Sequence, residues 1–495
     1  MEGLLLLVAV LLPAAGSLMV VYLPWLNQSR QDRCLFVGAV MVLECIVVLI
    51  IALDAERTLI LFEMTKQLPI ALRSDATSRI FSVLMALMWT IAGFYSFSYM
   101  SHEQNEKSYY AFYLITMASL IALTLSATMV TMYLFFELMT LLSMPMVLHS
   151  RTKEAVAAGI KYLIYSVAGA TMGLLGIFML TPNIASPYFV EGGSLLTGQL
   201  TLSHTAFQVI LVITLIGFGT KAGMFPMHGW LPTAHPVAPS PASAVLSGVI
   251  TKAGVLCIFR IIFYVVGPDY LRGTWVQWTL LGCAATTVFM GSMLALKEKT
   301  LKKRLAYSSV SQVSYVLCGI FLLDTMALGG ALLQMVFHAL TKDALFLCAG
   351  AIIYKTGFTQ VDDMRHLGKS MPWTMWLFTI CGISLVGIPP LGGFIAKWYI
   401  AEGALVSGAA VFSWLVPVVL LISAILTAGY LLPISVSAFF GGISPGDAAP
   451  ALQKKNDPSL MMLVPISMLT LATLILGIFP GFMIDLFNKL AGSLF

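Results

Sequence analysis

The chain has 495 residues, of which 59% are hydrophobic and only 10% are charged, and its mean hydropathy is +0.93. Soluble domains carry roughly a quarter charged residues. This composition therefore excludes a soluble globular protein and indicates an integral membrane protein. The net charge of +5 is small for a chain of this length, and we expect no nucleic acid partner.

Apolar stretches of about 20 residues, the length that a helix needs to cross a hydrocarbon core about 30 Å thick, follow one another along the chain. We predict an all-α membrane protein with about fourteen transmembrane helices. We interpret the first span as retained rather than as a signal peptide, because no basic region precedes it. The predicted spans cover residues 3–23, 34–53, 78–100, 108–126, 129–149, 156–181, 204–224, 242–266, 275–296, 304–324, 328–353, 373–398, 411–438 and 459–488.

Basic residues are distributed unevenly over the loops between these spans. Loops that follow odd-numbered spans hold fifteen lysine and arginine residues, whereas loops that follow even-numbered spans hold four. Lysine and arginine concentrate on the cytoplasmic side of membrane proteins. The pattern predicts a multi-pass protein of the cell inner (cytoplasmic) membrane with both termini outside.

The cysteines and glycines form no pattern typical of a cofactor site. All seven cysteines lie singly, without a CxxC pair, and no glycine-rich phosphate loop is present. The polar gaps are also shorter than the roughly 50 residues that an independent domain requires. We therefore expect one membrane domain with no cofactor and no redox or hydrolytic site of its own.

Two stretches combine proline and glycine inside otherwise apolar segments. They are "FPMHGWLPTAHPVAPSP" at 225–241, which contains Pro226, and "GIPPLGGFIAKW" at 387–398, which contains Pro389 and Pro390. Proline removes a helix donor and glycine relaxes the backbone. We predict that the seventh and twelfth helices are broken there, because broken spans in the two halves of a transporter mark its ion path.

The spacing of these breaks indicates an internal repeat. Pro226 and Pro389 lie 163 residues apart, and the fourth and ninth spans begin 167 residues apart. Two five-helix units are expected, and because five is odd, the second unit is inverted relative to the first. The predicted division is an N-terminal three-helix segment (1–107), a first repeat (108–267), a second repeat (268–440) and a C-terminal helix (441–495).

Ionisable side chains inside predicted spans are costly, at roughly 2.5–3.5 kcal/mol each, and usually mark function. Glu137 lies near the middle of the fifth span, and Lys161 lies about one turn inside the sixth. We expect the two to form a pair. The pair either couples proton movements in the two helices or only orients them as a structural ion pair.

Lysines flank the first break and lie along the second half of the chain. Lys221 precedes the break at Pro226, and Lys252 lies in the middle of the eighth span. A buried lysine can exchange its proton, so both are candidate proton stations, with snorkelling to the interface as the alternative for Lys221. In the eleventh span His338 and Lys342 share one helix face, and Asp343 points elsewhere.

Lys397 follows the second break and is the expected end of the line. His338 alone could be an ordinary core histidine, but beside Lys342 we interpret it as part of the relay. His228 and His235 match no metal motif, and we expect them to order or gate the loop between the broken helices. No metal site is expected.

Four strings carry a resemblance to a known family. "FPMHGWLPTAHPVAPSPASAVLSGVITKAGV", "KRLAYSSVSQ", "FHALTKDALFLCAGAIIY" and "GIPPLGGFIAKW" resemble the antiporter-like, proton-translocating membrane subunits of respiratory complex I, energy-converting membrane-bound hydrogenases and Mrp-type sodium/proton antiporters. The resemblance covers about residues 108 to 400. It implies fourteen helices with two inverted repeats, and a relay whose members are Glu137, Lys161, Lys221, Lys252, His338, Lys342 and Lys397.

The resemblance leaves the host complex open. We favour a redox-driven, membrane-bound hydrogenase-type complex, because the "HGWLPTAHPVAPSP" loop is similar to that of hydrogenase and complex I members. Iron-sulfur clusters and a nickel-iron site would then lie in partner subunits, and further antiporter-like subunits are expected beside this one. The alternatives are a D-type subunit of a Mrp antiporter, with sodium moving as well as protons, and a structural scaffold whose buried charges only pair.

Overall fold

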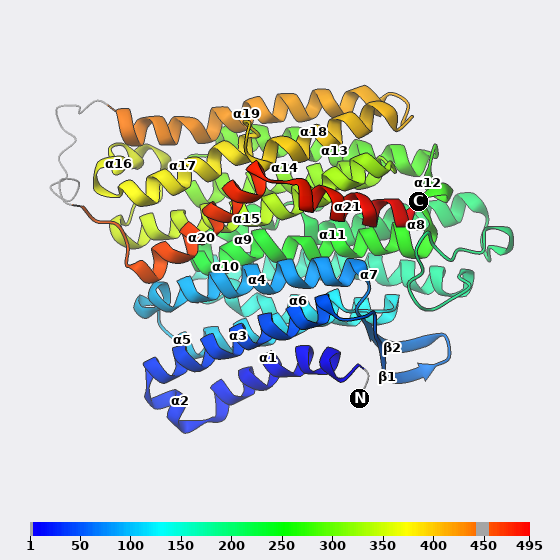
Figure 1. Ribbon diagram of the computed structural model, residues 1–495, viewed down its shortest axis with the longest axis horizontal. Coiled ribbons are helices and arrows are strands. Elements are labelled where there is room, and N and C mark those ends of the chain that lie inside the picture. Colours follow the sequence, from blue (N-terminus) through cyan, green and yellow to red (C-terminus); the bar gives the residue numbers. More distant parts are fainter. Residues whose placement is uncertain (1–2, 442–454) are drawn as a thin grey trace.

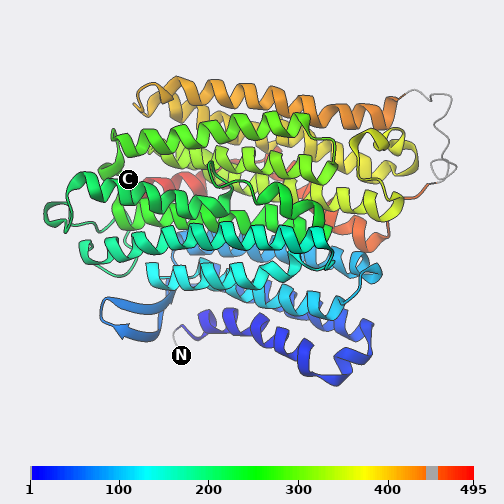
Figure 2. The ribbon, with the colours of Figure 1, turned by 180° about the vertical axis from the view of Figure 1, so that it is seen from behind.

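The computed structural model of the protein describes residues 3–441 and 455–495. Its helices lie side by side with their long axes nearly parallel (Figure 1). The two labelled chain ends lie toward the same end of this bundle, and the view from behind shows the same arrangement (Figure 2). The chain therefore crosses the bundle and returns repeatedly, as the alternation of apolar spans and polar loops predicts.

The first half of the chain contains the helices that lead to the first break. Several of them begin at a residue whose side chain accepts a backbone N–H, such as Asp75, Thr128, Thr152 and Ser203. The elements are α1 (Leu4–Tyr22), α2 (Pro24–Gln28), α3 (Arg30–Leu53), α4 (Ala76–Tyr99), α5 (Glu106–Thr124), α6 (Met129–Val147), α7 (Lys153–Leu180), α8 (His204–Ala222) and α9 (Leu231–Val237).

The second half begins with a wholly buried segment that runs from α10 through two π-helical stretches, η4 and η5. The elements are α10 (Ser240–Val245), η4 (Leu246–Ile250), α11 (Thr251–Arg260), η5 (Ile261–Val266), α12 (Pro268–Leu271), α13 (Trp275–Lys297), α14 (Leu301–Phe321), α15 (Thr325–Thr356), α16 (Leu367–Ser370), α17 (Pro372–Val386), α18 (Gly392–Val406), α19 (Phe412–Phe440), α20 (Leu460–Ile478) and α21 (Gly481–Leu494).

Within the described residues, eleven helical segments are long and apolar enough to cross a membrane. The other three predicted spans are helical too: 108–126 corresponds to α5, 304–324 to α14, and 373–398 to the pair α17 and α18. Helix α14 carries a polar string that includes Ser308, Ser309 and Gln312, which lowers its hydropathy. The protein is thus a helical membrane protein that spans the bilayer many times.

Two expectations about the elements require correction. The protein is not all-α, because β1 (Thr58–Thr65) and β2 (Leu68–Arg73) pair as an antiparallel hairpin in the loop after α3. The β-branched and aromatic residues of "TLILFEMT" favour a strand once the helical pattern has ended. The last predicted span, 459–488, is two helices, α20 and α21, interrupted at Phe479 and Pro480. Most of the preceding basic loop, including Lys454, lies outside the described residues.

Helix α15 occupies the centre of the bundle. It is 32 residues long and contacts α4, α10, α14, α17, α18, α20 and α21, and 25 of its residues are buried. Its N-terminus is fixed by Asp324, whose carboxylate accepts the N–H groups of Met326 and Ala327. The hydroxyl of Tyr95 on α4 donates to the Leu347 carbonyl on α15 (2.9 Å). This helix holds His338 and Lys342, so the fold places both inside the protein rather than against lipid.

Candidate functional site

The helix breaks predicted around Pro226 and Pro389 are both present, and the two have the same backbone form. Gly223 (φ 79°) follows the last residue of α8 and Gly387 (φ 90°) follows the last residue of α17, and both glycines are in the left-handed conformation that residues with a side chain rarely adopt. In each case the next two N–H groups fold back onto the last turn of the helix, as in a Schellman motif. The chain then leaves the helix axis without losing these hydrogen bonds.

The prolines of the two breaks lie on the outside of the chain. Pro226, Pro389 and Pro390 are exposed, and they carry no N–H group that would need a partner. The predicted loop at 225–241 is more ordered than expected, because its second half forms helix α9 and the subsequent start of α10. The interruption of the helix is therefore short, from Gly223 to Trp230.

Lys397 closes the second break. Its Nζ donates hydrogen bonds to the carbonyls of Leu385 (2.6 Å) and Val386 (2.8 Å), which are the last two residues of α17. A cation at a helix C-terminus is favoured both by the unpaired carbonyls and by the helix dipole. The same ammonium lies 5.1 Å from the centre of the Tyr315 ring. Lys397 is therefore a buried side chain that caps the C-terminus of α17 at the second break.

Lys221 is buried in a polar pocket at the end of α8. Its Nζ donates to the hydroxyls of Tyr162 (2.7 Å) and Ser166 (3.2 Å), and it lies 4.3 Å from the centre of the Tyr162 ring. Only 1% of its surface is exposed. The Tyr162 hydroxyl also shares a hydrogen bond with Ser143 (2.7 Å) on α6. Lys221 therefore does not snorkel to the membrane surface, and a chain of hydroxyl groups leads from it to α6.

Glu137 and Lys161 do not form the expected ion pair. Glu137 is half-buried on α6 and accepts a hydrogen bond from the Tyr133 hydroxyl (3.3 Å), whereas Lys161 on α7 lies 5.9 Å from the centre of the Tyr165 ring. The lysine whose charge acts on the Glu137 carboxylate is Lys221. Both helices turn apolar residues outward beside these groups, so Glu137 and Lys161 lie near the surface of the chain rather than in its core.

The centre of the site is a direct contact between two helices. The Nζ atom of Lys252 on α11 lies 2.6 Å from Nδ1 of His338 on α15, and it donates to the Ser247 carbonyl at 2.8 Å. Both side chains are 1% exposed. Ser247 belongs to η4, and π-helical turns of this kind widen a helix and occur often at functional sites. The Ser247 hydroxyl bonds that of Ser309 (2.6 Å), which ties η4 to α14.

Lys342 faces α14 from the same side of α15 as His338. Its Nζ donates to the Leu305 carbonyl (3.1 Å) and to the Ser308 hydroxyl. The charges of Lys252, Lys342 and Lys397 all act on the His338 ring. The serine string of α14 therefore supplies partners for two of the predicted relay groups, Lys342 directly and Lys252 through Ser247.

A narrow gap, too small to hold a water molecule, lies between His338 on α15 and the neighbouring ends of α17 and α18. It is lined by Gln334, Phe337, His338, Thr341, Ser384, Leu385 and Gly393. Three polar atoms of these residues, His338 Nε2, Gln334 Oε1 and Ser384 Oγ, are buried without a hydrogen-bond partner among the residues that the structure describes. Buried polar atoms are normally paired with protein or ordered water. These unpaired atoms lie beside Leu385, whose carbonyl binds Lys397.

No hydrogen bond joins His338 to Lys397, and the line of contacts is also interrupted between Lys221 and Lys252. Lys221 and Lys252 lie on neighbouring helices, α8 and α11, which approach closely where Gly254 packs against the backbone of α8. In the described part of the chain no hydrogen bond joins the two lysines, nor does any side chain bond both of them. The predicted relay therefore consists of a first group around Lys221 and a second around Lys252, His338, Lys342 and Lys397.

The two loop histidines have separate surroundings. His235 is fully buried in α9 and stacks on Phe346 (4.7 Å between ring centres), with neither ring nitrogen hydrogen-bonded to a described residue. His228 is half-buried and stacks on Phe225. Over 3–441 and 455–495, no three histidine, cysteine or acidic side chains gather closely enough to hold a metal ion.

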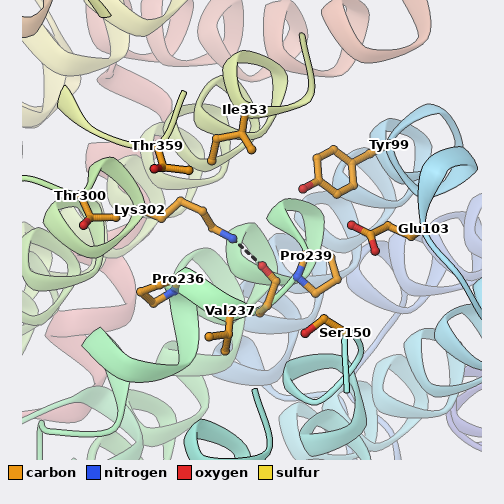
Figure 3. A pocket seen from close by; sticks show the side chains of 11 residues that line it. Tyr99, Glu103, Ser150, Pro236, Val237, Pro239, Thr300, Lys302, Ile353 and Thr359 are labelled. Carbon is orange, nitrogen blue, oxygen red and sulfur yellow. Dashed lines mark hydrogen bonds between the residues drawn. The ribbon is translucent and has the colours of Figure 1, made fainter. Parts of the chain in front are cut away.

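Sequence reasoning missed a pocket at the end of the bundle where the basic loops lie. It is lined by Tyr99, Glu103, Ser150, Pro236, Val237, Ala238, Pro239, Thr300, Lys302, Ile353 and Thr359. Figure 3 shows the Lys302 side chain crossing it to the Ala238 carbonyl, with Glu103 and Tyr99 on the far side. Lys302 is 5% exposed. In the sequence it belonged to a basic run, and nothing there separated it from the solvated lysines beside it.

Arg260, the last residue of α11, is buried inside the protein and does not lie at the membrane interface. The guanidinium is 1% exposed and makes a two-point ion pair with Asp75, with hydrogen bonds of 2.7 and 2.8 Å, and it also bonds Ser78. Tyr264 and Phe189 cover it on either side. This pair joins the end of α11 to the start of α4 and belongs to the framework rather than to the lysine line.

These features define a class of protein: a many-spanning helical membrane subunit of the antiporter-like type, with two broken helices and buried lysines between them. A family description supports this class directly, because residues 126–427 match "NADH:quinone oxidoreductase/Mrp antiporter, TM". The chain belongs to this family.

Curated relatives come from three kinds of complex. The chain is 32% identical over 409 residues to the N subunit of NADH-quinone oxidoreductase of Desulforudis audaxviator, covering 80% of this chain and 79% of that one. It is 29% identical over 413 residues to the D-type Na(+)/H(+) antiporter subunit of Alkalihalophilus pseudofirmus, covering 82% and 80%. It is also 32% identical over 347 residues to hydrogenase-4 component B of Escherichia coli, covering 67% of this chain and 50% of that one.

Two solved structures share the fold. A chain of the Mrp complex from Dietzia superposes with a TM-score of 0.84 at 22% identity, covering 98% of this chain and 97% of that chain. A chain of the membrane-bound sulfane sulfur reductase, an archaeal respiratory membrane complex, gives 0.84 at 21% identity, covering 99% and 97%. The antiporter-like fold that the sequence predicted is confirmed, and so is ion transport through a membrane as the general role.

Proposed function

We propose that this chain is the proton-translocating subunit of a multisubunit membrane complex and that protons move along its buried lysines and histidine. The observation that carries the proposal is the direct contact between Lys252 and His338 in the fully buried centre of the chain. Intramembrane ionisable residues are costly and usually mark ion pathways. No carboxylate forms an ion pair with Lys221, Lys252, Lys342 or Lys397 in the described residues, as a purely structural role would favour.

Repulsion between neighbouring cations supplies a physical mechanism. Two positive charges 2.6 Å apart in a medium of low dielectric constant repel each other strongly. At most one of the two groups, the Lys252 ammonium or the His338 imidazolium, is therefore positively charged at a time. A proton that arrives at one group therefore drives the other to release its proton. Gln334 and Ser384, which lie in the gap beside Leu385, are the polar groups through which we propose that the released proton reaches Lys397.

On this proposal Lys221 and Glu137 form the coupling element of the first half, and Lys161 acts at the edge of the chain. The Glu137 carboxylate and the Lys221 ammonium interact electrostatically, and Tyr162 and Ser143 connect the lysine to α6. A change in the charge of Glu137 then alters how strongly Lys221 holds its proton. His228 and His235 lie in the segment between the first break and α10, where they order the loop beside this element.

The finer architecture is part of the proposal. We count fourteen crossings, with two inverted five-helix repeats at 108–267 and 268–440, after a three-helix segment (1–107) and before the C-terminal segment (441–495). The shared form of the breaks at Gly223 and Gly387 supports the repeat. Both termini are proposed to lie outside the inner membrane, and their location at one end of the bundle agrees with an even number of crossings (Figure 1).

For the host complex we propose a redox-driven, membrane-bound hydrogenase-type respiratory complex. Its iron-sulfur clusters and nickel-iron site would lie in partner subunits, beside further antiporter-like subunits. The likeness to hydrogenase-4 component B and to the N subunit of NADH-quinone oxidoreductase supports this choice. The second candidate is a D-type Mrp subunit that moves sodium as well as protons, which the likeness to the D-type antiporter subunit over 82% of the chain favours.

The subunits that copurify with the tagged chain separate these two candidates. A redox-driven complex yields iron-sulfur and nickel-iron subunits, and its proton uptake into inverted vesicles requires an electron donor. A Mrp complex yields only membrane subunits, and its proton movement requires a sodium gradient. A chain that purifies alone, and whose vesicles move protons with neither driving force, would contradict both.

A further inference from the structure

Asp343 is a buried acid that the relay described above does not use. It lies on α15 next to Lys342, but its side chain leaves the helix in another direction. None of its surface is exposed, and neither carboxylate oxygen has a hydrogen-bond partner among the described residues. Buried carboxylates are normally paired or hydrogen-bonded, because burial of an isolated charge is very costly. Asp343 therefore requires an explanation.

The backbone opposite Asp343 is the π-helical turn η4. A Cβ atom placed on Gly248, in the middle of this turn, would overlap the Asp343 carboxylate. Glycine is thus the residue that lets the acid lie directly against the widened turn. The same turn contributes the Ser247 carbonyl that binds Lys252. Asp343 and Lys252 consequently lie against one π-helical turn, although no hydrogen bond or ion pair joins them in this structure.

The other titratable groups around Asp343 are few. Lys342 points to α14, where it bonds Leu305 and Ser308, and Tyr113 on α5 uses its hydroxyl to bond the Trp89 carbonyl (2.6 Å). Within the described residues no third acidic, histidine or cysteine side chain joins a cluster here. A sodium ion needs several oxygen ligands, so a single carboxylate without neighbours favours a proton as the ligand.

We infer that Asp343 is a second proton-carrying group of the central site, which exchanges a proton with Lys252. In one state the carboxylic acid and the amine are both neutral. In the other the O–H bond of the acid has broken and an N–H bond has formed on Nζ of Lys252, after the two side chains, which are not hydrogen-bonded to each other in this structure, have met beside η4. The total charge of the pair is zero in both states. This inference rests on the proposed function, because it assigns the acid to the same relay.

The test uses the intact complex in inverted membrane vesicles with the D343N variant, since asparagine retains the shape but not the proton. We expect proton transport to fall by about 10²-fold, the scale of a lost proton-transfer group. D343E, which keeps the acid, recovers part of the rate. The matched control is D485N, which changes an exposed aspartate on α21 and leaves transport unchanged. Thermal unfolding of D343N occurs at the parent temperature or above, because an unpaired buried acid has been removed.

Infrared difference spectroscopy gives a second measurement, because the carboxylic acid band of Asp343 changes during turnover only if this group gains and loses a proton. The carboxylic acid band that responds to turnover disappears in D343N and stops responding in K252M, where the exchange partner is absent. If D343N fails to assemble, G248A, which displaces the acid from the turn, must lose both the band response and transport. Parent-like transport in D343N or an unchanged band overturns the inference alone, whereas parent-like transport in K252M overturns the proposed function itself.

Discussion

Lys397 binds the carbonyl of Val386 at 2.8 Å, and this contact joins the second half of a broken helix to the last turn of the first half. The same Nζ binds the Leu385 carbonyl, so one side chain satisfies two helix-terminal acceptors. The residue at the end of the proposed proton line is thus also a structural clamp. A proton that leaves Lys397 weakens a charge-assisted bond to the break, which couples proton release to the geometry of α17 and α18.

The first prediction concerns this clamp. K397M should lower the free energy of unfolding by about 1.5–3 kcal/mol, the worth of hydrogen bonds from a charged group, and should stop proton transport. K397Q, which retains a donor, should recover part of the stability but not the transport. Thermal unfolding in detergent measures the first effect, with K489M on the exposed face of α21 as the control. A K397M protein as stable as K489M would argue against the clamp.

The second prediction concerns the ion pair between Arg260 and Asp75. R260M leaves a buried carboxylate unpaired, so we expect a loss of about 3–5 kcal/mol in stability. The double variant R260M/D75N should be closer to the parent, because asparagine is neutral and still caps α4. Yield and thermal unfolding of the purified complex measure both. A double variant that is less stable than R260M would mean that the pair has a role beyond mutual neutralisation.

The third prediction concerns the partner of Glu137. In double-mutant cycles of transport rate, E137Q and K161M should combine additively to within about 0.5 kcal/mol, since the two side chains do not meet. E137Q and K221M should show a coupling above this value. Strong coupling between E137Q and K161M would instead mean that Glu137 and Lys161 interact directly. Parent-like transport with both Glu137 and Lys161 replaced by apolar residues would favour a scaffold.

The fourth prediction concerns orientation. S150C, at the pocket of Figure 3, should react with a membrane-impermeant maleimide only from the cytoplasmic side. G198C should react only from outside, and a Cβ at Gly198 meets no other atom, so this control does not disturb the fold. Labelling of intact cells and of inverted vesicles distinguishes the two sides. The reverse pattern would invert the proposed topology.

The broken helices and the buried lysines could be predicted because each depends on local sequence. Proline close to glycine favours a helix end, although single prolines such as Pro145 and Pro417 lie inside helices. A lysine such as Lys252 inside an apolar span is costly in lipid and therefore points into the protein. Contacts that depend on how helices rotate against each other could not be predicted. Lys161 falls at the right depth to meet Glu137, yet its helix turns it toward Tyr165.

Long-range and irregular features were also beyond sequence reasoning. The partner of Arg260 lies 185 residues away in the chain, at the start of another helix. The π-helical turn at Gly248 has no simple sequence signal, although it determines which groups surround Lys252. The hairpin at β1 and β2 was missed because residues 54–77 were interpreted only as a loop between two spans.

The most direct test of the central claim is proton translocation by the assembled complex after Lys252 is replaced by alanine. The fifth prediction is that K252A assembles with its full set of subunits but moves protons only at the background rate. The control K153A, which changes an exposed lysine at the start of α7, should pump at the parent rate. A K252A complex that pumps as fast as the parent would contradict proton transfer through the buried line.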